Sequence, residues 1–290
     1  MQNNFETIMK PAKIRCIVAI FLYILVCSHF SLATEYKLSM LPRYSTEEIN
    51  KRIIPLAKYL TKQTGMQIEP TLTASFGQYS KQLSSGNINI GFENPYIYVM
   101  AAGQHEVIAM AVKGEDGDKG DGGDKFRGII ITRADSSLQT IEDLKGKKIA
   151  IVGYTSAGGF LSQKLTLVQH QIDLSKECTI EEAPENKQEN VILAVYTGDV
   201  DAGFIRESAL NQVDEFVPPG AIRILQSTEW LPNWALSVSS NMPVDDKAKI
   251  IQAIRDLKPG DPVLKALKVN ALRPAQDNEY DPVRIAAGLK

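Results

Sequence analysis

The sequence predicts an α/β fold in which mostly parallel sheets are flanked by helices. Short apolar runs rich in β-branched residues alternate with segments whose apolar residues recur at helical spacing. Such alternation is typical of parallel strands joined by crossover helices. The length of 290 residues suggests about two domains of ordinary size. The net charge of −2 gives no sign of a basic surface that would bind nucleic acid.

The N-terminus has the pattern of a secretory signal peptide. Lys10, Lys13 and Arg15 precede the apolar run 16–27, and Ser-Leu-Ala at 31–33 is a small-x-small cleavage pattern. The apolar run is short for a spanning helix, which needs about 20 residues. We therefore expect residues 1–33 to be removed after Ala33, with a lipid anchor at Cys27 as the weaker alternative.

The first half of the mature chain predicts strands separated by helices. Ser45 with Glu48 three residues on is the pattern of a capping box, and Gly65 is placed to end the helix that follows. Pro55 should kink that helix or reset its start. The expected strands are 38–41, 66–72, 87–92 and 107–112, and the expected helices are 46–64, 76–83 and one that starts at Pro95.

The second half predicts the same alternation. We expect a short strand at 128–132, a helical turn at 141–144, and a loop at 230–233 before the last strong strand. The tail beyond residue 257 has little local signal. The remaining expected strands are 149–152, 177–182, 201–205, 221–225 and 234–239, and the remaining expected helices are 186–197, with residues 191, 193, 194 and 195 facing inward, and 248–257.

A strand, a turn of small residues and a helix start follow one another at 149–161. Gly153 and Tyr154 form the turn, and Thr155 or Ser156 can cap a helix whose apolar positions are 160, 161, 165 and 168. A helix N-terminus attracts anions through its free N–H groups and its dipole. The spacing matches neither a Walker A loop nor a Rossmann fingerprint. The alternative is that the small residues only let the helix pack close to the strand.

The Gly- and Asp-rich segment 115–125 resembles a calcium loop at first sight. The EF-hand pattern fails because Gly120 and Asp121 stand in reverse order and no Glu closes the loop. A surface loop is the expected structure. The mature chain keeps one cysteine, Cys178, for which a buried structural role is expected.

Several segments together resemble the periplasmic solute-binding proteins of phosphate, phosphite and phosphonate ABC transporters. The resemblance covers about residues 38–280. The segments that carry it are 55–65, which begins Pro-Leu-Ala-Lys-Tyr-Leu; 86–92, Gly-Asn-Ile-Asn-Ile-Gly-Phe, with Pro95 and Tyr98; 128–132; Asp135-Ser136 with 141–147, Ile-Glu-Asp-Leu-Lys-Gly-Lys; 198–203, Gly-Asp-Val-Asp-Ala-Gly; and 231–233, Leu-Pro-Asn.

This resemblance implies a two-lobed architecture of the type II periplasmic-binding-protein class. Lobe 1 would comprise 34–132 plus 236–290, and lobe 2 would comprise 133–235, with hinge strands near 131–135 and 231–236. The ligand would lie between the lobes, which would close over it.

The resemblance also implies site residues, and several depart from the family pattern. In the oxyanion loop Ser156 is kept, but Ala157 and Gly158 stand where the family has hydroxyl residues. Two tyrosines of the family pocket correspond to Phe76 and Phe126.

Further departures concern the family's polar ligand contacts. A histidine of aminophosphonate binders falls near Gln188, and the aspartate that holds the ligand amine falls at Trp234, while Glu207 matches a family glutamate within one residue. These changes remove donors or carboxylates, so a small oxyanion or a ligand with an apolar portion fits better than an aminophosphonate. The expected ligand-binding residues are Tyr44, Phe76, Glu93, Asn94, Phe126, Tyr154, Thr155, Ser156, Ala157, Gly158, Gly159, Gln188, Arg206, Glu207 and Trp234; Arg43 and Arg127 also lie beside candidate cleft loops.

The leading hypothesis is therefore a monomeric extracytoplasmic protein that captures phosphite, phosphate or a phosphonate-like anion for an ABC importer. Its partners would be the permease subunits, and it would work in the periplasm. The alternative is a ligand sensor that signals to a histidine kinase. Catalysis is not expected, because His105 and His170 belong to no metal-spaced cluster and to no Ser-His-Asp arrangement. No metal or cofactor is expected.

Overall fold

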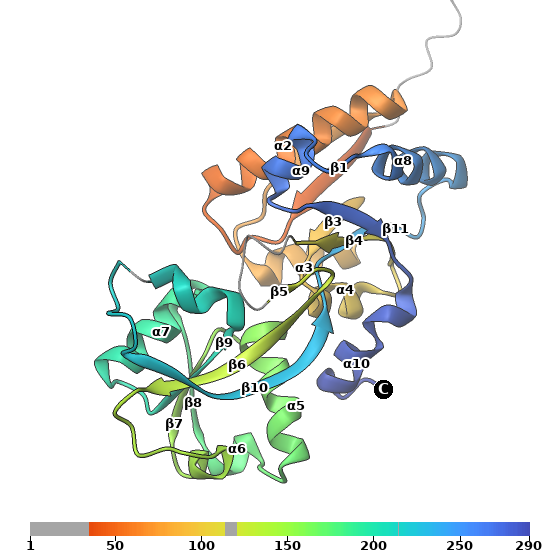
Figure 1. The fold of residues 1–290 in the computed structure, drawn as a ribbon. Coiled ribbons are helices and arrows are strands. Elements are labelled where there is room, and N and C mark those ends of the chain that lie inside the picture. The colour runs from red at the N-terminus through yellow and green to blue at the C-terminus, as the bar shows by residue number, and fades with distance from the viewer. Residues whose placement is uncertain (1–34, 114–120, 214) are drawn as a thin grey trace, which may run out of the picture. The chain divides into compact units, whose positions relative to one another are not determined.

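The computed structural model describes residues 35–113, 121–213 and 215–290. Residues 35–290 form one compact unit that contains two sheets (Figure 1). The expected signal peptide and most of the 115–125 loop lie outside the described residues. In the described part of the chain, no helix is both long and apolar enough to span a bilayer. The same residues contain no group of three or more His, Cys, Asp or Glu side chains that could hold a metal ion.

The first sheet has the strand order β12-β4-β11-β3-β1-β2. Strands β2, β1 and β3 run parallel, whereas β11 and β12 pair antiparallel with their neighbours. The strands of this sheet are β1 (Glu35–Met40), β2 (Gln67–Thr71), β3 (Ile90–Glu93), β4 (His105–Val112), β11 (Ala235–Ser239) and β12 (Ala271–Pro274). Its helices are α2 (Thr46–Thr64), α3 (Phe76–Ser84), α4 (Pro95–Ala101), α8 (Val244–Asp256) and α9 (Pro262–Leu267).

The second sheet has the order β10-β6-β9-β7-β8, and the short β5 pairs with β6. Again one part is parallel, β9-β7-β8, and the other antiparallel. The strands are β5 (Asp121–Gly122), β6 (Lys125–Arg133), β7 (Lys148–Ile151), β8 (Thr179–Glu182), β9 (Ala202–Arg206) and β10 (Ile222–Pro232). The helical segments here are η1 (Ile141–Leu144), η2 (Ala157–Leu161), α5 (Ser162–Gln169), α6 (Leu174–Glu177), η3 (Pro184–Asn186), α7 (Gln188–Thr197) and η4 (Glu207–Val213). The α/β class is confirmed, but both sheets are mixed, so the expectation of mostly parallel pairing holds for only one part of each.

Both faces of the second sheet are buried. Ile130, Ile151 and Phe204 pack in one apolar cluster, whereas their chain neighbours Ile129, Ile131 and Ile205 pack in another. Successive side chains of a strand point to opposite faces, so this alternation requires a helix layer on each side. Phe160 and Leu167 from η2 and α5 cover one face, and Val191 and Val195 from α7 cover the other.

The first long helix follows its sequence signals. The Ser45 side chain accepts a hydrogen bond from Glu48 N at 3.3 Å, and Gly65 ends the helix in the left-handed region with φ 73°. Helix α2 continues through Pro55, so the proline does not reset its start.

Two helix faces differ from expectation. Val168 was expected on the apolar stripe of α5, but it is 57% exposed. On α7 the fully buried apolar residues are Val191, Ile192 and Val195, whereas Leu193 and Ala194 are only partly buried against the same cluster. The apolar runs on these helices exceed the width of the face that the sheet can bury.

The segments that connect the two sheets differ from the boundaries expected from the sequence. Residues 125–132 belong to the second sheet, although the expected boundary put them in lobe 1. The expected loop at 230–233 is wrong for residues 230–232, because β10 continues to Pro232, paired with β6. Asn233 and Trp234 then lead directly into β11 of the first sheet (Figure 1).

The tail with little local signal is well structured. It forms β12 at the edge of the first sheet, η5 (Asp277–Tyr280) and α10 (Asp281–Ala287). Tyr280 is fully buried in a cluster with Tyr98 and Val107 of the first sheet's elements and Phe126 and Leu231 of the second sheet's strands. The C-terminal segment therefore packs where the two sheets meet.

Candidate functional site

The predicted strand, turn and helix start at 148–161 is present. Gly153 adopts φ 154°, a backbone conformation that side chains disfavour. Of the two expected caps, Ser156 is the one used, since its Oγ accepts from Gly159 N at 3.1 Å. The first turn, η2, is a π-helix rather than an α-helix. The N–H groups of the first helical residues have no acceptor within the helix, so Ala157 and Gly158 present donors at this end.

The glycines of η2 are required by close packing. A Cβ on Gly159 would lie 2.3 Å from Val152 Cγ2. A Cβ on Gly158 would lie 2.8 Å from the Phe126 ring and 3.2 Å from Arg206 Cβ. Small residues therefore let the helix pack close to its strand, as the alternative stated from the sequence proposed. Packing does not exclude the anion-site interpretation, because Ser156, Ala157 and Gly158 also line a cavity.

This cavity, which we call the cleft cavity, has a volume of about 30 Å³ and is lined from both sheets. Among its described lining residues two are cationic, Arg43 and Arg206, and none carries a carboxylate. The lining residues are Leu41, Arg43, Phe76, Asn94 and Trp234 from the elements of the first sheet, and Phe126, Val152, Ser156, Ala157, Gly158, Asn186, Gln188 and Arg206 from those of the second.

Arg206 stands at the end of β9 and is only 4% exposed. Its backbone N–H donates to Gln188 Oε1 at 2.9 Å, and its Nη2 lies 3.4 Å from Asn233 Oδ1. The guanidinium lies over the Phe126 ring, 4.2 Å from the centroid. An arginine guanidinium stays protonated in proteins, so Arg206 brings a positive charge to this cavity.

Arg43 approaches the cavity from the loop after β1. Its guanidinium lies 5.1 Å from the Tyr44 ring centroid and 5.9 Å from that of Trp234. Trp234 in turn packs on Phe92, with ring centroids 5.4 Å apart. Aromatic faces hold the Arg43 side chain without neutralising it.

The structure brings most of the expected site residues to the cleft cavity. Phe76, Asn94, Phe126, Ser156, Ala157, Gly158, Gln188, Arg206 and Trp234 line it. Tyr44 lines an adjoining cavity that shares Arg43, Arg206 and Trp234 with it. Thr155 does not line the cleft cavity, but its carbonyl accepts a hydrogen bond from Asn94 Nδ2 at 3.3 Å. Gly159 lies behind, with its N–H taken by Ser156.

Glu93 does not face the cleft cavity. It is fully buried behind β3, where Tyr79 Oη donates to Glu93 Oε2 at 2.7 Å and Ser237 Oγ lies 2.6 Å from Oε1. Burial raises the pKa of Glu93 to about 7, against the opposing effect of the two hydroxyl contacts. Glu93 therefore belongs to the core of the first sheet. Its placement there keeps a carboxylate, which would repel an anionic ligand, out of the cleft cavity.

The Glu207 carboxylate is paired with an arginine side chain and does not line the cleft cavity. It forms a two-pronged pair with Arg127, whose Nη2 donates to Oε1 at 2.8 Å. This hydrogen-bonded carboxylate raises the pKa of the Arg127 side chain. Neither member of the pair lines the cleft cavity.

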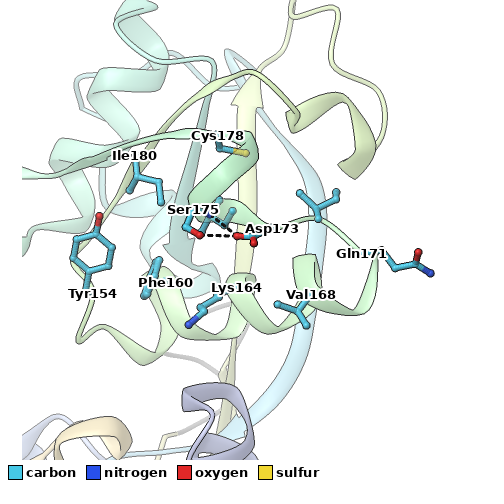
Figure 2. Close-up of a pocket in the computed structure, with 11 residues that line it drawn as sticks. Tyr154, Phe160, Lys164, Val168, Gln171, Asp173, Ser175, Cys178 and Ile180 are labelled. Carbon is cyan, nitrogen blue, oxygen red and sulfur yellow. Dashed lines mark hydrogen bonds between the residues drawn. The ribbon is translucent and has the colours of Figure 1, made fainter.

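Tyr154 points elsewhere as well. It is 49% exposed and packs edge-on against Phe160, with ring centroids 5.0 Å apart. Both line an open groove of about 780 Å³ beside α5 and α6, shown in Figure 2. The groove is the largest cavity described, but mostly apolar side chains line it.

Burial raises the pKa of its Cys178 thiol, which donates to Leu144 O at 3.3 Å.

The list of expected residues omitted Leu41, Val152 and Asn186, and named Arg43 only as a neighbour of the cleft loops. Asn186 lies in η3 directly after β8, which is parallel to β7, and its Nδ2 donates to Val152 O at 2.8 Å. The rule that ligands lie beyond the carboxyl ends of parallel strands could have found it. Leu41 and Val152 carry no polar signal that would have marked them.

Comparisons with known proteins show the family of this chain. The family model described as ABC transporter, phosphonate, periplasmic substrate-binding protein matches residues 38–280. The phosphate-import protein PhnD of Mycolicibacterium smegmatis is 24% identical over 230 residues, which cover 74% of this chain and 70% of that protein.

Two solved structures show the same fold at low sequence identity. A binding protein component of an ABC phosphonate transporter from Pseudomonas aeruginosa has a TM-score of 0.70 and 16% identity, covering 88% of this chain and 86% of that one. PhnD1 of Prochlorococcus marinus, solved with methylphosphonate, has a TM-score of 0.72 and 14% identity, covering 88% and 97%. The chain belongs to the family of periplasmic substrate-binding proteins of phosphonate ABC transporters.

Proposed function

We propose that this protein captures a small phosphorus oxyanion (phosphite, phosphate or a simple phosphonate) in the cleft cavity for an ABC importer. The observation that carries the proposal is the lining of that cavity: the start of η2 from one side, Arg43 and Arg206, and no carboxylate among its described residues. The matched family describes transporter components, which favours transport over the sensing alternative.

The lining suits a group with several anionic oxygens. Free N–H groups and the helix dipole at Ala157 and Gly158 attract negative charge, and arginines bind oxyanions with charge-assisted hydrogen bonds. Gln188 and Asn94 are buried amides at the same cavity. Buried anions are costly unless such donors compensate them, so this constellation supports an oxyanion guest.

The cavity implies movement on binding. Its volume of about 30 Å³ is that of a space for water, whereas a phosphonate group is larger. Binding therefore requires the lining side chains or the two sheets to move apart and close again, as in hinge-type binding proteins. The contact from Asn94 Nδ2 to Thr155 O joins elements of the two sheets, so it must break when they separate. The lobes proposed from the resemblance would turn about β6 and the passage from β10 to β11.

The aromatic lining restricts the ligand's other end. Phe76, Phe126 and Trp234 offer ring surface, and no carboxylate stands ready to pair with an amine among the described lining residues. A ligand amine buried there would lose its hydration without a partner. We therefore infer weaker binding of aminophosphonates than of methylphosphonate.

The remaining parts of the proposal follow from the family and the N-terminal pattern. The protein acts without catalysis, as a monomer that delivers its ligand to permease subunits. It is exported to the periplasm, with removal of residues 1–33 after Ala33.

Isothermal titration of the mature protein with phosphite, phosphate, methylphosphonate, 2-aminoethylphosphonate and sulfate tests the proposal. We expect binding of at least one of the first three. Arg43→Gln should weaken that binding about 10-fold or more, because a charge-assisted hydrogen bond contributes about 1.5–3 kcal/mol. Arg255→Gln on exposed α8 is the matched control and should bind as the wild type does. Failure of all five anions to bind would contradict the proposed function.

A further inference from the structure

We propose that the natural ligand carries a second acidic group, held in the cavity that adjoins the cleft cavity. This second cavity, which we call the basic chamber, has a volume of about 20 Å³ and shares Arg43, Arg206 and Trp234 with the cleft cavity. The inference rests on the proposed function and narrows its substrate class to short phosphonates or phosphates that also bear a carboxylate.

Cations from separate parts of the chain surround the basic chamber. Arg43 follows β1, Arg52 lies on α2, Lys113 follows β4, Arg206 ends β9 and Lys268 ends α9. No carboxylate is among its described lining residues. Glu48 lies outside that lining and pairs with both Arg52 and Lys268, at 2.7 and 3.0 Å.

The lowered pKa of the Tyr44 hydroxyl reflects the positive potential of the basic chamber. The Arg52 guanidinium lies 4.0 Å from its ring centroid, and that of Arg43 lies 5.1 Å away. Burial by itself would raise the pKa of the Tyr44 hydroxyl, but the charges of Arg43, Arg52, Lys113 and Arg206 lower it. An acid in this position would be stabilised in its ionised form by the same charges.

A buried donor without a partner borders the same space. Asn233 is fully buried and lines the basic chamber. Its Oδ1 accepts from Trp234 N at 2.9 Å and faces Arg206 Nη2, but its Nδ2 has no hydrogen-bond partner in the part of the chain that the structure describes. Buried amide donors are rarely left unpaired, and an oxygen of a bound ligand would satisfy this one.

The two cavities together specify the ligand's form. The cleft cavity presents the helix start and the basic chamber presents Asn233 and its surrounding cations, with the three shared residues between them. A short spacer therefore suffices to join an oxyanion in one to a carboxylate in the other. Phosphonoacetate has this form, whereas (2-hydroxyethyl)phosphonate has a similar size with a neutral end.

The test compares these two ligands and methylphosphonate by isothermal titration at low salt. We expect phosphonoacetate to bind roughly 10-fold more tightly than (2-hydroxyethyl)phosphonate, since charge-assisted contacts replace neutral ones. Lys268→Gln should reduce this ratio several-fold. Lys265→Gln, an exposed position on the same helix α9 that does not line the chamber, should leave the ratio and both affinities unchanged.

Each outcome decides between the two proposals. Binding of methylphosphonate with no preference for phosphonoacetate would overturn the basic chamber as an acid site and leave the proposed function standing. An unaltered preference in Lys268→Gln, with Lys265→Gln folded and unchanged, would also overturn it. Absence of binding for all three ligands and for phosphate would remove the proposed function, and this inference with it.

Discussion

At the residue scale, Gly159 shows how a single hydrogen in place of a side chain fixes the approach of a helix to its strand. Its φ of −117° is open to any residue, so the requirement for glycine comes from close neighbours: Val152 Cγ2 would lie 2.3 Å and Ser156 Oγ 3.0 Å from a Cβ. The same contact places Ser156 and Gly158 against the cleft cavity.

We predict that Gly159→Ala lowers the free energy of unfolding by about 1–3 kcal/mol, the usual cost of overpacking. The new Cβ would overlap Val152 Cγ2 at 2.3 Å. Urea unfolding measures the change. Combining it with Val152→Ala should recover part of the loss relative to the sum of the single variants, and strict additivity would show that the overlap is not the cause.

Glu93 belongs to a buried chain of hydrogen bonds, and its burial favours the neutral form. His105 Nε2 lies 3.1 Å from Ile88 O, a pure acceptor, so Nε2 carries the proton in the neutral ring. Nδ1 must then accept from Ser237 Oγ, 3.0 Å away. Ser237 Oγ also lies 2.6 Å from Glu93 Oε1. Burial lowers the pKa of His105 to about 4, which keeps the imidazole neutral.

The raised pKa of Glu93 predicts a pH dependence of stability. Between its ordinary value of 4.5 and about 7 the folded state holds a proton that the unfolded state has released. The stabilising contribution of the protonated carboxyl is therefore complete below about pH 4.5 and is lost as pH rises towards 7. As pH rises from 5 to 8, the free energy of unfolding of the wild type should fall relative to that of Glu93→Gln, because only the wild type carries this titrating carboxyl.

Denaturant unfolding of both proteins across that range provides the measurement. His105 titrates in the opposite sense: its low pKa means that stability is lost as pH falls below about 6.5. Because His105 is present in both proteins, the comparison isolates Glu93. A difference that stays constant from pH 5 to pH 8 would show that Glu93 ionises as an ordinary carboxyl.

At the scale of elements, the start of η2 combines a structural and a binding role. Ser156 caps the helix through Gly159 N and also lines the cleft cavity. The hydroxyl fixes the direction in which the neighbouring N–H groups point.

We predict that Ser156→Ala lowers the free energy of unfolding by about 1 kcal/mol, the typical cost of losing an N-cap. Affinity for the phosphorus oxyanion should fall in the same variant, because the helix start loses its fixed orientation. Ser45→Ala, which removes the equivalent cap of α2 at 3.3 Å, is the control. It should cost similar stability and leave affinity unchanged; equal losses of affinity in both would argue against a special role for η2.

Strand β10 was the element that sequence patterns described least well. Pro232 and the polar residues before it favoured a loop, yet β10 pairs with β6 up to that proline. Proline is tolerated because β10 is an edge strand, where one row of N–H groups needs no partner. Irregular register between Ile224 and Gln226, and between Ser227 and Trp230, breaks the period-2 pattern that would have revealed the strand.

At the scale of the whole molecule, the C-terminal segment closes the region where the sheets meet. Tyr280 packs edge-on against Tyr98 with ring centroids 4.7 Å apart, and its hydroxyl donates to Asn233 O at 3.2 Å. Tyr98 in turn donates to Asp277 Oδ1 at 2.6 Å. The passage from β10 to β11 is thus anchored by residues more than forty positions away in sequence.

We predict that Tyr280→Phe lowers the free energy of unfolding by about 1–3 kcal/mol, because it leaves the buried carbonyl of Asn233 without this donor while keeping the ring. Thermal or urea unfolding measures the loss. Tyr154→Phe removes a hydroxyl from a half-exposed ring and should be neutral. Equal stability of the two variants would mean that the Asn233 contact contributes nothing.

Local patterns predicted most elements and the part of the site that lies on one piece of chain. The Ser156 cap, the short strand before it and the helices that begin at Thr46 and Pro95 follow from neighbouring residues. The expected site residues divided according to packing: Phe126 and Gln188 line the cavity, whereas Glu93, Glu207 and Tyr154 contact other partners. Which partner a side chain meets depends on elements far away in sequence, so spacing alone could not separate these cases.

The sequence by itself determined the alternation of strands and helices, the capped helix start after Gly153 and the family to which the chain belongs, because each depends on short-range backbone preferences or on the order of motifs. Only the tertiary structure decided that the sheets are mixed, that β10 runs on to Pro232, and that cations from five segments converge beside Tyr44 and Asn233. Those features arise from strand pairing and burial between distant segments, for which adjacent residues carry no physical signal.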